Sequence, residues 1–154
     1  MKILCIVPCG KRKIWDKTKN AGPAQSRDVY IGPFAKKCRE YAERFFPDAY
    51  LILSAKYGFL YPSDIVPGPY NVSFNDRKTK PISVEELIAQ AKEKGLSGFD
   101  KVVVIGGVNY VDMAKRAFPE SSIITPLKGC KGMGYMLSRL SDAIKTGKSG
   151  ADND

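Results

Sequence analysis

The stretch Lys2-Ile-Leu-Cys-Ile-Val7, followed at once by Pro8-Cys-Gly-Lys-Arg-Lys-Ile-Trp-Asp16, decides the fold class of this chain. A continuous apolar run is typical of a strand that is buried on both faces, as in parallel α/β sheets. In open parallel sheets, ligands bind outside the carboxyl ends of the strands. Residues 8–16 therefore lie where an α/β protein places its chemistry, although a solvated basic loop with a structural cysteine explains the same residues.

The rest of the chain alternates apolar runs with segments of helical periodicity. Strands are predicted at 3–7, 49–53, 101–105 and 122–126, and helices at 34–46, 83–94, 110–118 and 133–144. Alternation of this kind implies right-handed crossovers. The sequence thus predicts one three-layer, Rossmann-like α/β domain over residues 1–146, with a mainly parallel sheet of four or slightly more strands. The proline-rich segment 59–81 is expected to be irregular, and 147–154 to be a disordered tail.

Composition places the chain among ordinary globular proteins. It has 154 residues, of which 44% are hydrophobic and 27% charged. No apolar run approaches the roughly 20 residues that span a bilayer, and the first residues lack the pattern of a signal peptide. We therefore expect a cytoplasmic protein without a membrane partner.

The chain contains no histidine, which removes whole classes of chemistry. Ser-His and Cys-His nucleophilic pairs are excluded, as are imidazole metal ligands. Cys5, Cys9, Cys38 and Cys130 show no C-x-x-C spacing, so neither a metal site nor a disulfide framework is expected, and no cofactor. Acid–base chemistry must then use Asp, Glu, Lys, Tyr or Cys.

The net charge of +9 favours anionic partners: a nucleotide, a nucleobase within one, or RNA or DNA. Between positions 11 and 27 there are six cations against the single acid Asp16. General lysine enrichment of the surface is the alternative explanation.

Four polar or glycine-rich segments follow predicted strands, at 8–15, 54–58, 106–110 and 128–132. Because the carboxyl ends of parallel strands share one sheet edge, we expect these segments to meet there. Each also has a plainer explanation: a tight turn for Gly106-Gly107, an exposed lysine for Lys56, and core packing for the aromatic residues.

The candidate catalytic residues are Cys9, Lys13, Asp16 and Lys56. Cys9 is the nucleophile or a close ligand contact, its thiolate favoured by Lys11 and Lys13. Lys13 or Lys56 holds a phosphate or acts as a base, and Asp16 or Asp28 serves as general acid–base. The predicted substrate-binding residues are Pro8, Gly10, Lys11, Trp15, Asp28, Tyr30, Ser54, Tyr57, Gly58, Tyr70, Asn71, Gly106 and Gly107.

The segment Ser54-Ala-Lys-Tyr-Gly-Phe-Leu60, with Pro62 and then Pro69-Tyr70-Asn71, resembles the signature of the YaaA-like superfamily. The resemblance covers about residues 3–144. It implies a link to peroxide stress and DNA binding.

A narrower resemblance concerns archaeosine synthase, which modifies a 7-deazaguanine base in tRNA. Pro8-Cys9 and Lys13 match the spacing of its motif, and Trp15 stands at the tyrosine position. Ile14, Thr18 and Ala21 replace its proline, serine and histidine. The resemblance implies a site that grips or attacks a base without performing the identical amide-forming reaction.

These observations favour an enzyme that recognises a nucleobase or nucleotide, a base-modifying transferase or glycosidase-like protein. A nucleic-acid-binding or oxidative-stress-protection protein without catalysis is the main alternative. A thiol redox sensor that pairs Cys9 with Cys5 or Cys130 is a third. The substrate, its free or polymeric form and the oligomeric state stay open.

Overall fold

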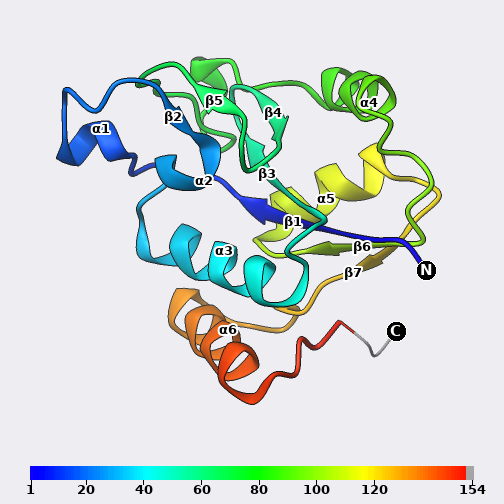
Figure 1. The fold of residues 1–154 in the computed structure, drawn as a ribbon. Helices are drawn as coiled ribbons and strands as arrows, with labels where there is room; N and C mark the ends of the chain where they lie inside the picture. Colours follow the sequence, from blue (N-terminus) through cyan, green and yellow to red (C-terminus); the bar gives the residue numbers. More distant parts are fainter. Residues whose placement is uncertain (152–154) are drawn as a thin grey trace.

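A computed structural model describes residues 1–151 of the protein (Figure 1). The main sheet has five strands in the order β4-β3-β1-β6-β7. Their bounds are Ile3–Pro8 for β1, Tyr50–Ser54 for β3, Gly58–Leu60 for β4, Lys101–Val104 for β6 and Ser122–Ile124 for β7. A separate antiparallel pair joins β2 (Ala24–Gln25) to β5 (Ile65–Val66).

Seven helices lie between and after these strands in residues 1–151. They are α1 (Ile14–Lys17), α2 (Ser26–Val29), α3 (Pro33–Phe45), the 3-10 helix η1 (Arg77–Thr79), α4 (Val84–Glu93), α5 (Val108–Ala117) and α6 (Met133–Thr146). The predicted capping box opens α4, where Ser83 accepts a hydrogen bond from the Glu86 amide and the Glu86 side chain accepts one from the Ser83 amide. Pro33 occupies the first turn of α3, where its missing N–H costs nothing.

Strand β1 is the centre of the sheet and runs parallel to both of its neighbours, β3 and β6. Strand β7 is parallel to β6, whereas β4 is antiparallel to β3. The mainly parallel sheet predicted from the sequence is therefore confirmed. The expectation of an irregular chain throughout 59–81 is wrong at three places, because Phe59 and Leu60 belong to β4, Ile65–Val66 forms β5 and Arg77–Thr79 forms η1.

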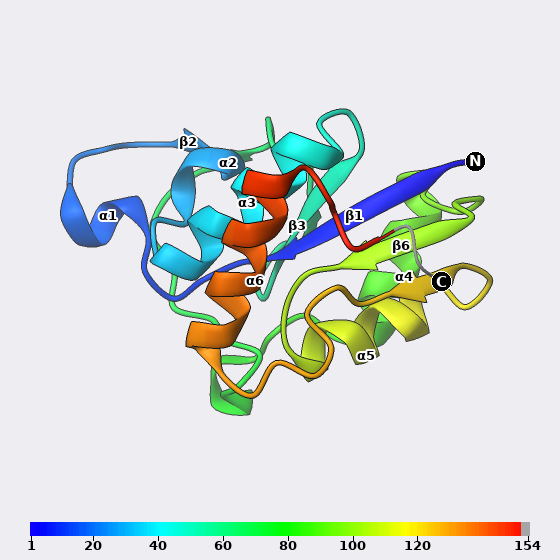
Figure 2. The same ribbon diagram turned by 90° about the horizontal axis from the view of Figure 1, so that it is seen from below.

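Helices cover both faces of the sheet (Figures 1 and 2). On one face Cys5 and Val7 of β1 pack into a core with residues of α3 and α6. On the other, Leu4 and Ile6 pack with residues of α4 and α5. Alternate residues of a strand point to opposite faces, so the single apolar run of β1 supplies both cores.

The segment after α6 is ordered as far as the structure describes it. Ser149 and Ala151 are buried, and the Tyr41 hydroxyl of α3 donates a hydrogen bond to the Ser149 carbonyl. The disordered tail expected from residue 147 is thus wrong for residues 147–151. Residues 152–154 lie outside the described part. Among residues 1–151, every helix is too short or too polar to cross a bilayer.

Candidate functional site

A cavity of about 420 Å³ opens beside the carboxyl end of β1. This volume lies in the usual range of small-molecule sites. Three segments form its wall: the loop after β1, the first turn of α5 and the segment 71–79. The residues are Cys9, Gly10, Lys11, Lys13, Asn71, Val72, Ser73, Phe74, Asn75, Asp76, Thr79 and Tyr110.

Lys13 is the unusual residue of this wall, because a lysine that is only 6% exposed as a whole residue is rare. Its ammonium donates a hydrogen bond of 3.1 Å to the Lys11 carbonyl and lies 4.4 Å from the centroid of the Tyr70 ring. It forms no ion pair with any carboxylate of residues 1–151. Burial lowers the pKa of Lys13, and the nearby Cys9 and Asp16 only partly oppose this shift.

Cys9 is half-buried at the end of β1, and its Sγ lies 3.5 Å from the Tyr110 hydroxyl oxygen. Burial raises the pKa of Tyr110, and the nearby Cys9 raises it further. The phenol therefore stays protonated at neutral pH and is able to donate to the sulfur. Cysteine, lysine and tyrosine thus meet at one wall.

Behind Lys13 lies a network of three hydroxyl groups. The Tyr70 hydroxyl bonds to that of Tyr30 and lies 3.0 Å from Ser54 Oγ. Ser54 Oγ also accepts hydrogen bonds from the amides of Lys56 and Tyr57, so its own proton is directed to Tyr70. Burial raises the pKa of Tyr30 to about 12 and also raises the pKa of Tyr70. These groups hold Tyr70 in place rather than lining the cavity.

Tyr70 is also surrounded by an aromatic ring and a second lysine. The Tyr57 ring packs edge-on against it, with centroids 5.4 Å apart. The exposed Lys56 places its ammonium 5.2 Å from the Tyr57 centroid and 5.6 Å from that of Tyr70. The predicted site residues Lys56, Tyr57 and Tyr70 therefore lie close together.

The segment 71–79 lines the cavity, and the sequence does not predict most of it as part of the site. Its Phe74 ring packs edge-on against Tyr110, and Asn75 accepts a hydrogen bond from Asn109. Within the segment, Thr79 Oγ1 accepts a hydrogen bond from the Ser73 amide. Of these residues only Asn71 was a candidate. The available signal was the unusual length of the irregular segment.

Several predicted site residues lie elsewhere. Trp15 is buried in the core, and its indole N–H donates to the Gly22 carbonyl, so its face is not part of the cavity wall. Asp16 accepts a hydrogen bond from the Lys13 amide and thereby caps α1. Asp28 is exposed on α2. Pro8 ends β1 opposite Leu53, directly before the cavity.

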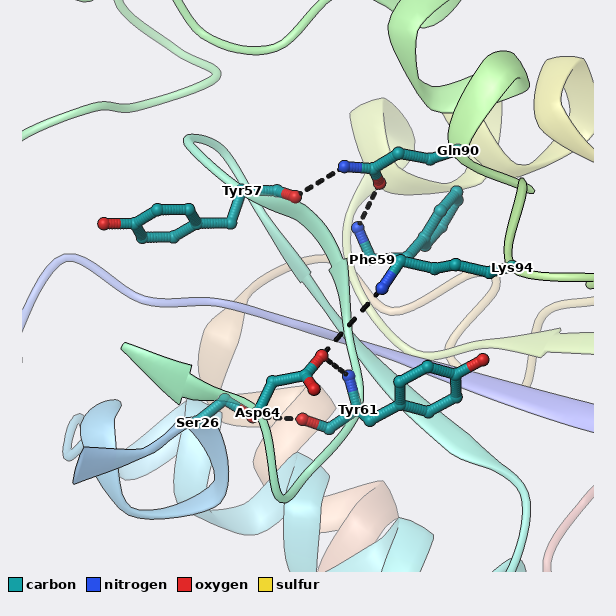
Figure 3. Close-up of polar contacts among 7 residues, drawn as sticks. All are labelled: Ser26, Tyr57, Phe59, Tyr61, Asp64, Gln90 and Lys94. Carbon is teal, nitrogen blue, oxygen red and sulfur yellow. Dashed lines mark hydrogen bonds and ion pairs between the residues drawn. The ribbon is translucent and has the colours of Figure 1, made fainter. Parts of the chain in front are cut away.

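Gly58 holds the β3–β4 hairpin rather than the cavity. It has φ +76°, and a Cβ there would lie 2.2 Å from Oε1 of Gln90. The Gln90 side chain accepts a hydrogen bond from the Phe59 amide and donates one to the Tyr57 carbonyl (Figure 3). Next to it in the same view, Lys94 pairs with Asp64. A glycine is therefore required for the packing of α4 on this hairpin.

Gly106 and Gly107 border a second cavity of about 450 Å³ between α5 and the loop before α6. Lys115, Lys128 and Cys130 belong to this second cavity. Three of the four segments therefore line two cavities rather than one, and residues 54–58 line neither of them.

A comparison with known proteins finds sequence similarity along almost the whole chain. The chain is 44% identical over 146 residues to the "Uncharacterized protein YfjM" of Bacillus subtilis (strain 168), covering 94% of this chain and 97% of that protein. The family model that matches residues 4–142 is described as "Family of unknown function (DUF6884)". These residues include both cavities and all but the outermost part of the fold. The chain belongs to the DUF6884 family.

Proposed function

We propose that this protein binds a nucleobase or nucleotide in the cavity at the end of β1 and acts on it as an enzyme, a base-modifying transferase or a glycosidase-like protein. In this proposal Cys9 contacts the reacting part of the base, and Lys13 supplies positive charge beside it. Asn71 and Asn75 offer amide groups for the edge of a base. The observation that carries the proposal is the half-buried thiol of Cys9 in the same wall as the buried residue Lys13, whose ammonium has no carboxylate partner among residues 1–151.

The burial of Lys13 lowers the stability of the fold, and a catalytic or binding role explains why such a residue is present. Burial of an ammonium without a carboxylate partner is unfavourable, and such groups cluster at functional sites. The resemblances of residues 54–71 to the YaaA-like superfamily and of residues 8–13 to archaeosine synthase support the same proposal. So does the Rossmann-like placement of a site at the carboxyl edge of a sheet with helices on both faces.

A thermal-shift screen with nucleosides, deazapurines and nucleotides tests the proposal. A ligand at a hundred times its Kd stabilises the folded protein by about 2.7 kcal/mol. For a domain of this size this raises Tm by roughly 5–10 °C. An unchanged Tm with every base and nucleotide in the screen contradicts the proposal.

The matched variants Cys9→Ser and Cys130→Ser test the role of the thiol, since both cysteines are half-buried. Once a substrate is found, Cys9→Ser is expected to abolish turnover while Cys130→Ser keeps it. Full turnover by Cys9→Ser removes Cys9 from the mechanism. A protein whose ligand binds but is never converted fits the binding function without catalysis.

One observation favours that second function, the binding of nucleic acid without catalysis. Of the six cations between positions 11 and 27, five are exposed, and none of the six pairs with a carboxylate of residues 1–151. Such a surface binds phosphates with strong salt dependence. Affinity for RNA or DNA that survives Cys9→Ser but falls in Lys11→Ala and Arg12→Ala, with no effect of nucleosides, identifies this function instead.

A further inference from the structure

We infer that the ligand of the cavity at the end of β1 carries a phosphate, and that Lys13 holds this phosphate. The inference rests on the proposed function and narrows its substrate class from bases and nucleosides to nucleotides. It starts from an imbalance of charge at the cavity wall.

The Lys13 ammonium has three N–H donors, of which the structure uses one, for the Lys11 carbonyl at 3.1 Å. The centroid of the Tyr70 ring lies 4.4 Å from the ammonium, and the ring attracts the cation without neutralising its charge. Lys13 as a whole residue is 6% exposed, and its two remaining donors have no hydrogen-bond partner among residues 1–151. A ligand in the cavity is therefore the group that completes them.

The neighbouring charges make an anion the favoured ligand. Lys11 lies in the same wall, and Lys56 approaches the Tyr70 ring from 5.6 Å. Two carboxylates lie nearby, Asp16 outside the wall and Asp76 in it, so the wall carries two lysines against one carboxylate. Asp16 accepts a hydrogen bond from the Lys13 amide, and Asp76 accepts one from the Lys78 amide. Neither forms an ion pair with Lys13, so the positive charge stays available to the cavity.

A phosphate is the anionic group that nucleotides carry, and lysine binds it as a point charge. It also brings several acceptor oxygens to a donor that lacks partners. A phosphate at Lys13 leaves Cys9 within reach of the base, because both side chains line one cavity. The amides of Asn71 and Asn75 in the same wall stay available to the edge of the base.

The experiment measures Kd for matched pairs of a nucleoside and its 5′-monophosphate, for each of the common bases, by titration calorimetry. Inorganic phosphate and a dinucleoside monophosphate are measured beside them, so that a free nucleotide and a polymer are told apart. We expect the monophosphate to bind at least about tenfold more tightly than its nucleoside, the effect of one charge-assisted hydrogen bond. In Lys13→Met this preference is lost.

Lys17→Met is the matched control, because Lys17 lies in α1 four residues away, is exposed and is not part of the cavity wall. It is expected to keep the preference. If Lys13→Met does not fold, the affinities of the unaltered protein for nucleoside and monophosphate still test whether the ligand carries a phosphate.

Equal affinity for nucleoside and monophosphate overturns the inference and leaves the proposed function intact. A phosphate preference that survives in Lys13→Met also overturns it, because another residue then holds the phosphate. Binding of inorganic phosphate that depends on Lys13, with no effect of any base, keeps the phosphate site and rejects nucleobase recognition. Silence from every phosphate-bearing compound overturns it.

Discussion

The Lys13 ammonium lies 4.4 Å from the centroid of the Tyr70 ring, and the loop after β1 is thereby joined to the segment that leads into 71–79. The two residues are 57 positions apart in the chain, so the contact fixes one side of the cavity across the fold. Its stabilising effect is small, about 0.5–2 kcal/mol for a cation over an aromatic ring. Because the burial of Lys13 is itself unfavourable, this arrangement is better explained by function than by stability.

Lys13→Met is expected to leave the free energy of unfolding equal to or higher than that of the unaltered protein. The substitution removes a buried charge whose pKa is lowered by burial, and methionine fills a similar volume. Urea denaturation at pH 7 measures this, with Lys17→Met as the exposed control. A clear loss of stability in Lys13→Met means that the ammonium is a structural group.

Alkaline pH is expected to destabilise the protein through its buried tyrosines. Burial raises the pKa of Tyr30 to about 12, and the pKa values of Tyr70 and Tyr110 are raised as well. The unfolded protein releases these protons near pH 10 and the folded protein only at higher pH. The stabilisation is therefore complete below about pH 10 and is lost as pH rises, by up to about 1.4 kcal/mol per pH unit for each tyrosine.

Urea midpoints between pH 8 and 11 measure this loss, and Tyr30→Phe is expected to reduce its slope. The lowered pKa of Lys13 acts in the opposite direction, because the unfolded chain keeps that proton up to about pH 10.5. Its contribution raises stability between the lowered pKa and pH 10.5, before the tyrosines take over. A flat profile to pH 11 contradicts the burial of the phenols.

Gly58→Ala is expected to cost about 2–4 kcal/mol of folding free energy. A left-handed residue other than glycine costs about 1–2 kcal/mol. The new Cβ also displaces the Gln90 amide from its two hydrogen bonds to the hairpin. Gly95→Ala is the control, since Gly95 has φ +67° with no atom within 4 Å of the Cβ position. Equal losses for the two variants mean that Gln90 moves freely.

Phe74→Ala and Asn109→Ala are expected to loosen the segment 71–79 without unfolding the domain. They remove the ring contact with Tyr110 and the hydrogen bond to Asn75, which tie the segment to α5. The ring contact contributes about 0.5–1.5 kcal/mol. Hydrogen exchange is expected to rise in a peptide covering 73–79 and to stay unchanged in β6. Unchanged exchange in 73–79 shows that other contacts hold the segment.

The sequence predicts the parts of this fold that depend on local pattern. The apolar run of β1 marks the central strand, and Ser83 with Glu86 marks the start of α4, because periodicity and capping are local. Strand β4 escapes prediction because three residues carry no period, and Gln90 of another element stabilises it. Contacts of this kind become visible only in the folded chain.

The candidate site likewise combines residues that the sequence predicts with contacts that only the folded chain shows. Cys9 and Lys13 follow the central strand, so the sequence predicts their place at the sheet edge, whereas nothing local predicts that Asn71 lines the same cavity. The sequence does not reveal that Lys13 is buried while Lys11 and Arg12 beside it are exposed. The flat ring of Trp15 predicts a place in the pocket. In the structure its indole N–H instead donates a hydrogen bond to the carbonyl of Gly22, seven residues further along the chain.

That indole gives the protein a built-in optical reporter. Trp15 is the single tryptophan of the chain, it is 6% exposed, and it stands two residues from Lys13. The tryptophan emission of the protein therefore comes entirely from the short helix α1, which follows the loop of the cavity wall. A shift of the emission wavelength on titration reports a change in this one place, without any label and without a background from other indoles.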